Sequence, residues 1–289
     1  MCALFLALRP AHWAKNGLLA APALLAQLPW TGELVFKLVL GMVLASACAS
    51  AGYLVNDVLD RGADRTHPVK CARPIASGAL PVRSALGMAA ALAAAALATA
   101  WLALGPLVGA LLALYLASTV LYSLAVKRLI AVDVLLLAGL YMLRLEIGAE
   151  IAGVAISGWL LAFGFTLFTA LALLKRLDEL AIVKANGTPV VSRRAYGAEH
   201  GRIVERVAIG LMAAAMALLA GYVVAAAWHY YSAPAWLWLA VFLFGTWLAL
   251  ISRHARRGQL RADPVAFAIT DPLSLALAAG VLAALLLAR

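Results

Sequence analysis

Apolar residues stand in long blocks along almost the whole sequence, and polar residues gather in the segments between them. A helix that crosses ~30 Å of hydrocarbon needs ~20 mostly apolar residues, and the blocks approach or exceed that length. They do not alternate apolar and polar residues at every second position, as the strands of a membrane barrel would. The pattern predicts nine transmembrane helices, near residues 17–30, 34–55, 83–104, 106–124, 131–152, 158–175, 205–228, 234–252 and 271–288.

Helix breakers mark two of the boundaries. Pro22 and Pro29 interrupt the first block, which is barely long enough to span a membrane. Gly105-Pro106 is a strong turn signal between the third and fourth blocks. We predict an all-α polytopic membrane protein with one integral membrane domain, residues 1–289, whose main loops lie at about 56–82 and 176–204.

Composition supports this class of protein. The chain has 289 residues and is 66% hydrophobic, more apolar surface than one soluble core of this size could hide. The start, MCALFLALRPAHWAKNG, does not have the order of a cleavable signal peptide. The three cysteines and the histidines lack metal-ligand spacing, so we expect neither a disulfide nor a zinc site.

The distribution of Lys and Arg predicts the orientation, because cytosolic loops of membrane proteins are enriched in these residues. Of the 23 Lys and Arg residues, all but Lys37, Arg144 and Arg289 fall on one side of the nine predicted helices. The N-terminus and the long loops are therefore expected in the cytosol and the C-terminus outside. The net charge of +10 follows from this topology, and no nucleic-acid partner is needed to explain it.

Positive charge in the loops does not explain the acids in the stretch LVNDVLDRGADRTHPVKCARPIASGAL, residues 54–80. The spacing of Asp57, Asp60 and Asp64 places the three carboxylates on one helical face, with Asn56 beside them. Like charges stacked in this way repel one another and call for a compensating cation. A hard divalent ion such as Mg²⁺, which also bridges to phosphates, is one candidate. Salt bridges to Arg61 and Arg65 at a solvated helix end are the alternative.

Two parts of this stretch resemble the UbiA superfamily of intramembrane prenyltransferases. NDVLDRGAD fits its NDxxDxxxD motif, and HPVKCARPIASG fits the RPxxSG segment that follows. Other segments are similar to the branch that contains polyprenyl-phosphate phosphoribosyltransferases: RPAHWAKN, YSLAVKRLIAVDVLLLAGLYMLR, KRLDEL and ADPVAF. Aromatic prenyltransferases usually carry a second DxxxD motif after the sixth span, where this chain has only the adjacent Asp178 and Glu179.

The resemblance implies a nine-helix UbiA-like bundle with a cytosol-facing active-site cavity, in a bacterial cytoplasmic membrane. It implies Mg²⁺, for which Mn²⁺ can substitute, and two substrates, phosphoribosyl pyrophosphate and a polyprenyl phosphate. The products are polyprenyl-phosphoryl-ribose 5-phosphate, a precursor of lipid-linked arabinose, and pyrophosphate. Oligomeric state and lipid length do not follow from the sequence.

The resemblance and the chemistry together indicate candidate site residues. Metal ligands are expected among Asn56, Asp57, Asp60 and Asp64, and the three aspartates are joined by Lys15 and Arg73 as catalytic candidates. Lys15, Lys70, Arg73, Lys127 and Arg128 are the basic candidates for binding phosphates, because Arg and Lys pair with phosphate oxygens. The remaining candidates for contacting substrate are Asn16, Tyr122, Asp133, Arg144, Lys175, Arg176 and Glu179.

Three ionisable residues, Arg144, Glu146 and Glu150, stand inside the fifth predicted helix. Charges at that depth are costly and are usually functional or paired with one another. Arg144 matches the branch motif, whereas the glutamates do not. We expect the glutamates to pair with Arg144 or with another helix, or Glu150 to reach the outer interface.

Two other functions remain open. An ordinary UbiA prenyltransferase would use the same metal site to ionise a prenyl diphosphate and alkylate an aromatic acceptor. A transporter would place polar or broken helices near the membrane midplane. Most charge in this chain gathers at one membrane face instead, which favours an enzyme supplied from the cytosol.

Overall fold

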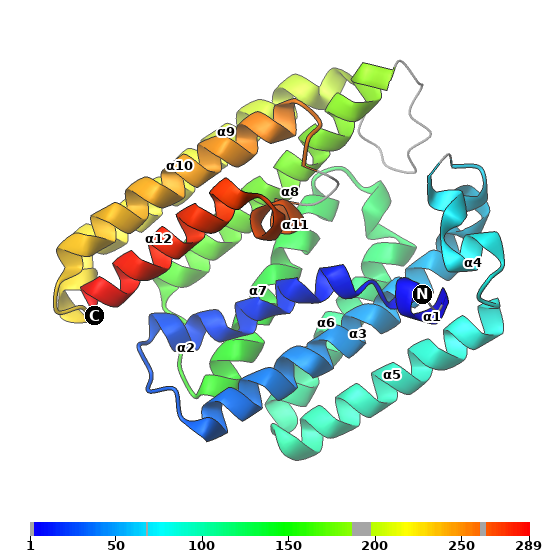
Figure 1. The fold of residues 1–289 in the computed structure, drawn as a ribbon, viewed down its shortest axis with the longest axis horizontal. Coiled ribbons are helices and arrows are strands. Elements are labelled where there is room, and N and C mark those ends of the chain that lie inside the picture. The colour runs from blue at the N-terminus through cyan, green and yellow to red at the C-terminus, as the bar shows by residue number, and fades with distance from the viewer. Residues whose placement is uncertain (1–2, 68, 187–197, 261–263) are drawn as a thin grey trace. The chain divides into compact units, whose positions relative to one another are not determined.

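The computed structural model of the protein describes residues 3–67, 69–186, 198–260 and 264–289, and within these ranges every regular element is a helix (Figure 1). The helices group into two compact units, residues 1–156 and 157–289. The all-α fold predicted from the sequence is therefore confirmed for the described residues.

The first unit is built around one long helix, α3, which packs against α5, α6 and α7 and against the N-terminal segment. Thr31 begins α3, because its hydroxyl accepts a hydrogen bond from the N–H of Leu34 at 3.2 Å. The elements of this unit are α1 (Ala3–Leu8), the 3₁₀ helix η1 (Pro10–Ala20), α2 (Ala21–Leu25), α3 (Gly32–Arg65), η2 (Lys70–Ala72), α4 (Pro74–Ser77), α5 (Val82–Ala103), α6 (Pro106–Leu124), η3 (Val126–Arg128) and α7 (Val132–Ala152).

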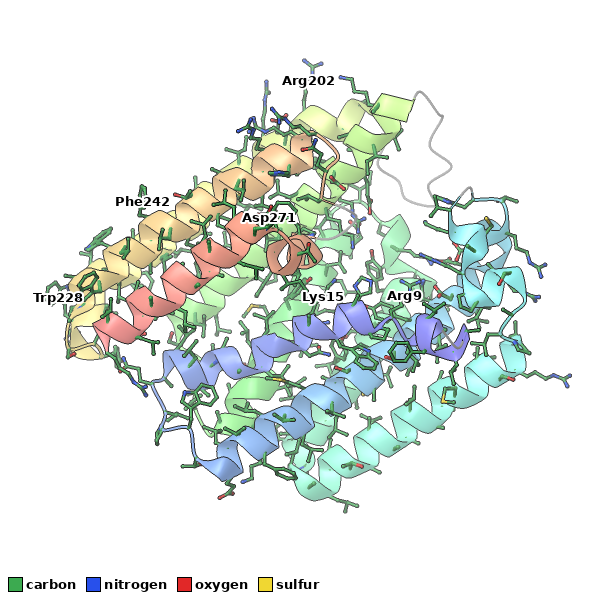
Figure 2. All side chains as sticks on the ribbon, in the orientation of Figure 1. Arg9, Lys15, Arg202, Trp228, Phe242 and Asp271 are labelled. Carbon is green, nitrogen blue, oxygen red and sulfur yellow. The ribbon has the colours of Figure 1, made fainter. Side chains whose placement is uncertain are left out.

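The second unit consists of long helices that pack in pairs, α8 with α9 and α10 with α12. Figure 2 shows Trp228 and Phe242 pointing away from the helices of this unit, as expected for apolar side chains that face lipid. Its elements are α8 (Gly158–Asn186), η4 (Ala198–His200), α9 (Gly201–Ala225), η5 (Ala227–His229), η6 (Pro234–Trp236), α10 (Leu237–Arg256), α11 (Pro264–Thr270) and α12 (Pro272–Ala288).

Within the described residues, six helices are long and apolar enough to cross a membrane. They are α3, α5, α6, α8, α9 and the segment Pro234–Arg256. The six coincide with predicted spans, and the break at Gly105-Pro106 is confirmed by the φ angle of 107° at Gly105. Of the other three predicted spans, α7 carries four charged residues and α12 has only 17 residues, so the total of nine remains a prediction.

The predicted helix at 17–30 is wrong as a continuous element. A 3₁₀ helix occupies Pro10–Ala20 and only five residues, Ala21–Leu25, are α-helical. Prolines explain the interruption: Pro22 lies in the first turn of α2, and Pro29 cannot donate a backbone hydrogen bond within a helix.

Two predicted loops are partly helical. Helix α3 continues through Arg65, so residues 56–65 extend the predicted span instead of forming a loop. Helix α8 likewise continues to Asn186, beyond the expected end near 175, and residues 187–197 of the second loop lie outside the described structure. Polar residues can continue a helix beyond an apolar block, which is why hydropathy alone placed both ends too early.

The backbones of the N-terminal segment and α7 lie close together at Gly148, where there is no room for a side chain. A Cβ atom added at Gly148 would collide with the carbonyl oxygen of Leu19. Such small-residue contacts allow tight helix packing in a membrane, where burying apolar surface adds little driving force.

We expect Gly148→Ala to lower the free energy of unfolding by about 1–3 kcal/mol. The added Cβ would meet the backbone carbonyl group of Leu19, which cannot move aside as a flexible side chain could. Gly139→Ala on the same helix is the matched control, since nothing lies within 4 Å of the Cβ position there. Alanine at that site should be neutral or stabilising by up to ~1 kcal/mol. Thermal unfolding of both purified variants in detergent measures the difference, and equal melting temperatures would contradict the packing argument.

Candidate active site

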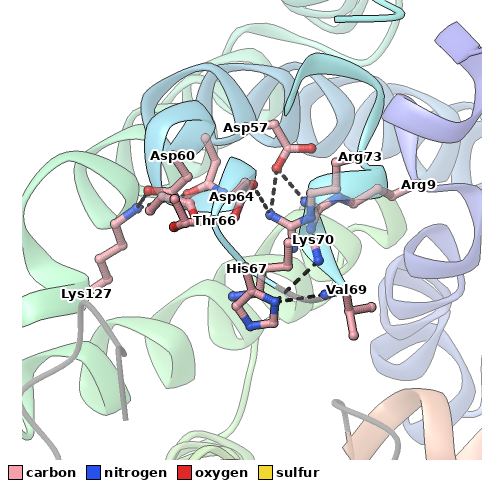
Figure 3. Close-up of polar contacts among 12 residues, drawn as sticks. Arg9, Asp57, Asp60, Asp64, Thr66, His67, Val69, Lys70, Arg73 and Lys127 are labelled. Carbon is pink, nitrogen blue, oxygen red and sulfur yellow. Dashed lines mark hydrogen bonds and ion pairs between the residues drawn. The ribbon is translucent and has the colours of Figure 1, made fainter. Parts of the chain in front are cut away.

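The three aspartates at the C-terminal end of α3 are each bound by a side-chain cation. Asp57, which is 3% exposed, accepts hydrogen bonds at Oδ1 from Arg9 and, at 3.3 Å, from Nη1 of Arg73. The same Nη1 atom of Arg73 lies 2.7 Å from Oδ2 of Asp64. One arginine therefore bridges two carboxylates that stand two turns apart, and Figure 3 shows Arg9 and Arg73 converging on them.

Lys127 neutralises the third carboxylate from another part of the chain. Its Nζ donates to Oδ1 of Asp60 at 2.7 Å and to Oδ1 of Asn56 at 3.4 Å. Lys127 belongs to η3, directly after α6, and approaches α3 from the side away from Arg9 and Arg73 (Figure 3). The repulsion expected among the stacked aspartates is thus relieved by Arg9, Arg73 and Lys127, and not by Arg61 or Arg65.

Arg73 is positioned by the short segment between α3 and α4. The Nδ1 atom of His67 accepts hydrogen bonds from the N–H groups of Val69 (3.2 Å) and Lys70 (3.3 Å), which shapes the turn before Arg73. Burial of the imidazole, and then the nearby Lys70 charge, lower the pKa of His67 below its ordinary 6.5. A neutral imidazole keeps Nδ1 available as an acceptor, so the turn is favoured at neutral pH.

The N-terminal segment lies along one face of α3, and its side chains make polar contacts with that face. Besides the Arg9–Asp57 pair, Trp13 Nε1 donates to Ser50 Oγ at 3.0 Å and Asn16 Nδ2 donates to Ser46 Oγ at 2.8 Å. The residues contacted on α3 are 46, 50 and 57, which fall within about 40° of one helical face. The contacts fix the register of the segment, which runs antiparallel to α3. Its course can be followed in Figure 2 from Arg9 to Lys15.

The sequence predicts only a topological role for Arg9, and the structure adds it to the site. Its backbone adopts the left-handed conformation (φ 54°, ψ 61°), which is rare for a residue with a side chain. The guanidinium lies over the ring of Tyr53, 4.9 Å from its centroid, and reaches Asp57. The signal available in the sequence was its position at the start of the RPAHWAKN motif.

A second polar network lies in the core of the first unit, around Arg144. Its guanidinium donates to Oδ1 of Asn16 (3.0 Å), to the Leu140 carbonyl (2.8 Å) and to the Tyr115 hydroxyl (2.7 Å). The rings of Tyr115 and Tyr141 lie 4.8 and 5.0 Å from the guanidinium carbon. Arg144 thus connects α7 with α6 and the N-terminal segment.

Neither expected glutamate partner reaches Arg144. Glu146 and Glu150 are exposed on α7, and among the described residues neither has a hydrogen bond or an ion pair. The expectation that they pair with Arg144 is therefore wrong, because α7 turns them to a different face from the buried guanidinium.

The other candidates of the first unit vary in burial. Lys15 and Tyr122 are half-buried, Asp133 is fully buried at the start of α7, and Lys70 is exposed. The Arg128 side chain lies outside the described part of the structure.

Lys175, Arg176 and Glu179 belong to the second unit and lie within α8, not at its end. Arg176 is 1% exposed, so it does not extend to a membrane interface, and its Nη1 donates to Oε2 of Glu179 at 2.7 Å. Their neighbour Asp178 is also buried and accepts a hydrogen bond from the N–H of Leu260 at 2.9 Å. This carboxylate holds the segment after α10 against α8.

Whether a metal ion could bind at the end of α3 depends on which ligand atoms the residues there offer. In the part of the chain that the structure describes, no three His, Cys, Asp or Glu residues are arranged to hold an ion by themselves. The carboxylates of Asp57, Asp60 and Asp64 and the amide oxygen of Asn56 are nevertheless the hard oxygen donors that Mg²⁺ prefers. Mg²⁺ usually takes one or two carboxylates and completes its shell with water and substrate phosphates, and the residues fit that mode.

Long apolar helices and a charged cluster at the end of one of them define a multi-pass helical membrane protein with a polar site. Residues 17–275 match the UbiA prenyltransferase family. The chain belongs to this family, which is a family of transferases.

Three relatives are similar over most of the chain. Nodulation protein NoeC of Azorhizobium caulinodans is 32% identical over 272 residues, 93% of this chain and 87% of that protein. The uncharacterized protein y4nM of Sinorhizobium fredii is 31% identical over 92% of this chain, which spans about half of its length (52%). Decaprenyl-phosphate phosphoribosyltransferase of Corynebacterium glutamicum is 38% identical over 190 residues, 64% of this chain and 56% of that protein.

The fold is also that of a solved member of the family. A UbiA homologue from Archaeoglobus fulgidus bound to GPP and Mg²⁺ superposes with a TM-score of 0.74. The alignment covers 98% of this chain and 99% of that chain at 18% identity, so it supports the architecture alone.

We expect Arg144→Met to destabilise the protein by about 2–4 kcal/mol, because it removes three hydrogen bonds and leaves Asn16 and Tyr115 without that partner. Arg144→Lys should recover little of the lost stability, since a lysine ammonium group cannot make the forked hydrogen bonds of a guanidinium group. Glu146→Gln on the same helix is the control and should leave the melting temperature unchanged. A full-stability Arg144→Met variant would show that the network is dispensable.

Proposed function

We propose that this protein transfers 5-phosphoribose from phosphoribosyl pyrophosphate to a polyprenyl phosphate, which gives polyprenyl-phosphoryl-ribose 5-phosphate and pyrophosphate. The observation that carries the proposal is the alternation of three carboxylates and three cations at the end of α3. Oxygen donors suit Mg²⁺, and guanidinium and ammonium groups suit phosphates. The 38% identity to a decaprenyl-phosphate phosphoribosyltransferase favours a phosphoribosyl donor over other diphosphates.

The proposal includes the membrane arrangement expected from the sequence. The protein spans a bacterial cytoplasmic membrane nine times, with its N-terminus and the end of α3 at the cytosolic face, where the water-soluble donor is available. The polyprenyl chain lies in the bilayer, so that its phosphate reaches the same face.

Bound Mg²⁺, held by Asp57, Asp60, Asp64 and Asn56 directly or through water, would stabilise the negative charge that builds on the departing pyrophosphate. Arg73 and Lys127 lie at the same carboxylates and would contact phosphate oxygens, with Lys15, Lys70 and Arg128 as further candidates. The acceptor phosphate is already ionised and needs no strong base. The residues therefore act by alignment and charge stabilisation.

The buried position of Asn16 and Arg144 changes their proposed role. Both polar groups of the Asn16 side chain are bonded to protein, the amide N–H to Ser46 and the oxygen to Arg144. We propose that this pair positions the N-terminal segment, and with it Lys15 and Arg9, and does not contact substrate. Lys175, Arg176 and Glu179 remain proposed substrate contacts.

One observation favours a second candidate, a prenyltransferase that acts on an aromatic acceptor. The structurally similar homologue from Archaeoglobus fulgidus was solved with GPP and Mg²⁺. Such an enzyme would use the same cluster for a prenyl diphosphate. A transporter has no comparable support.

Purified protein in nanodiscs should release pyrophosphate only when Mg²⁺, phosphoribosyl pyrophosphate and decaprenyl phosphate are all present. Asp57→Asn should reduce the rate by about 10²-fold or more, since it removes charge from the group proposed to bind metal. Glu33→Gln is the matched control at the opposite, exposed end of α3, where the Glu33–Lys37 pair contributes little. Release of pyrophosphate from geranyl diphosphate in the presence of 4-hydroxybenzoate, with no release from phosphoribosyl pyrophosphate, would instead identify an aromatic prenyltransferase.

A further inference from the structure

Each carboxylate at the end of α3 contacts a side-chain cation of the protein itself. Asp57, Asp60 and Asp64 supply three negative charges, and Arg9, Arg73 and Lys127 supply three positive charges in direct contact with them. We propose that these cations are exchangeable counter-ions, so that a divalent cation and a diphosphate bind the site together and neither binds it well alone. This inference rests on the diphosphate chemistry of the proposed function and adds Arg9 to the residues that determine binding.

The first argument is competition for the same oxygen atoms. Arg9 and Arg73 share Oδ1 of Asp57, Arg73 also binds Oδ2 of Asp64, and Lys127 binds Oδ1 of Asp60. An ion that bonds directly to one of these oxygens must displace the cation from it. A metal ion arriving alone would also face the repulsion of a guanidinium or ammonium group that has lost its carboxylate.

The second argument is charge balance in a partly buried place. The side chains of Asp57 and Asp64 are 3% and 6% exposed, and that of Lys127 is 9% exposed, so solvent screens them poorly. A divalent cation alone leaves an excess of positive charge, and a diphosphate alone leaves an excess of negative charge. The two together nearly cancel, and each displaced cation gains a phosphate oxygen in place of its carboxylate oxygen.

The third argument is the origin of the three cations. Arg9 precedes η1, Arg73 lies between η2 and α4, and Lys127 lies in η3, so each comes from a different short segment beside α3. Long Arg and Lys side chains can turn from a carboxylate to a nearby phosphate while α3 stays in place. The Arg9 side chain is additionally guided by the ring of Tyr53.

The test is substrate-free Mn²⁺ binding to the full chain in detergent, followed by electron paramagnetic resonance. Wild-type protein should bind Mn²⁺ weakly, and Lys127→Met should bind it about tenfold more tightly, because the competitor for Asp60 is gone. Lys37→Met is the matched control, since it removes an ammonium paired with an exposed carboxylate on the same helix. It should leave Mn²⁺ affinity unchanged.

A second arm measures coupling. Added inorganic pyrophosphate should increase protein-bound Mn²⁺ in the wild type by about tenfold at fixed free Mn²⁺, and by less in Lys127→Met and Arg9→Met. Equal Mn²⁺ affinity of wild type and Lys127→Met, or saturation of the wild type by Mn²⁺ alone, would overturn the inference. The wild-type arm decides the matter even if both variants fail to fold, as judged by gel filtration and thermal unfolding.

These outcomes are independent of turnover. Coupled binding without any reaction of phosphoribosyl pyrophosphate would retain the counter-ion inference and remove the proposed function. If the wild type is saturated by Mn²⁺ alone and still converts phosphoribosyl pyrophosphate, the proposed function is retained and the counter-ion inference is removed.

Discussion

The structure of the first unit depends on one electrostatic constraint, the need to neutralise three aspartates at the end of a long helix. Two of these carboxylates are almost fully buried, and burying an unpaired charge is far more costly than any single hydrogen bond. The chain meets this need with cations from the N-terminal segment, the segment after α3 and the segment after α6. The three segments are thereby drawn to one place, which is where the proposed substrates would bind.

The same face of α3 links this site to the core of the unit. Ser46 and Ser50 hold Asn16 and Trp13, and Arg144 holds Asn16 from the opposite side. Arg9, six residues before Lys15, is kept within reach of Asp57 by these contacts. Because polar groups inside a membrane protein must find protein partners, the network both orders the N-terminal segment and determines its register on α3.

Membership in the UbiA prenyltransferase family gives these contacts a chemical context. Oxygen donors interleaved with phosphate-binding cations suit a reaction in which a diphosphate departs, whichever group it leaves. The choice between a phosphoribosyl and a prenyl donor depends on the rest of the substrate.

The sequence by itself determined the helical class, six of the membrane-spanning segments and the acidic face of α3, because periodicity and hydropathy are local properties of the chain. It also predicted Arg73 and Lys127 beside phosphates. Only the tertiary structure decided which cation meets which carboxylate, that Arg9 and not Arg61 or Arg65 binds Asp57, and that Arg144 is bonded to Asn16 and not to a glutamate. Those pairings join residues 48 and 128 positions apart, and such distances along the chain are set by how helices pack and not by any local pattern.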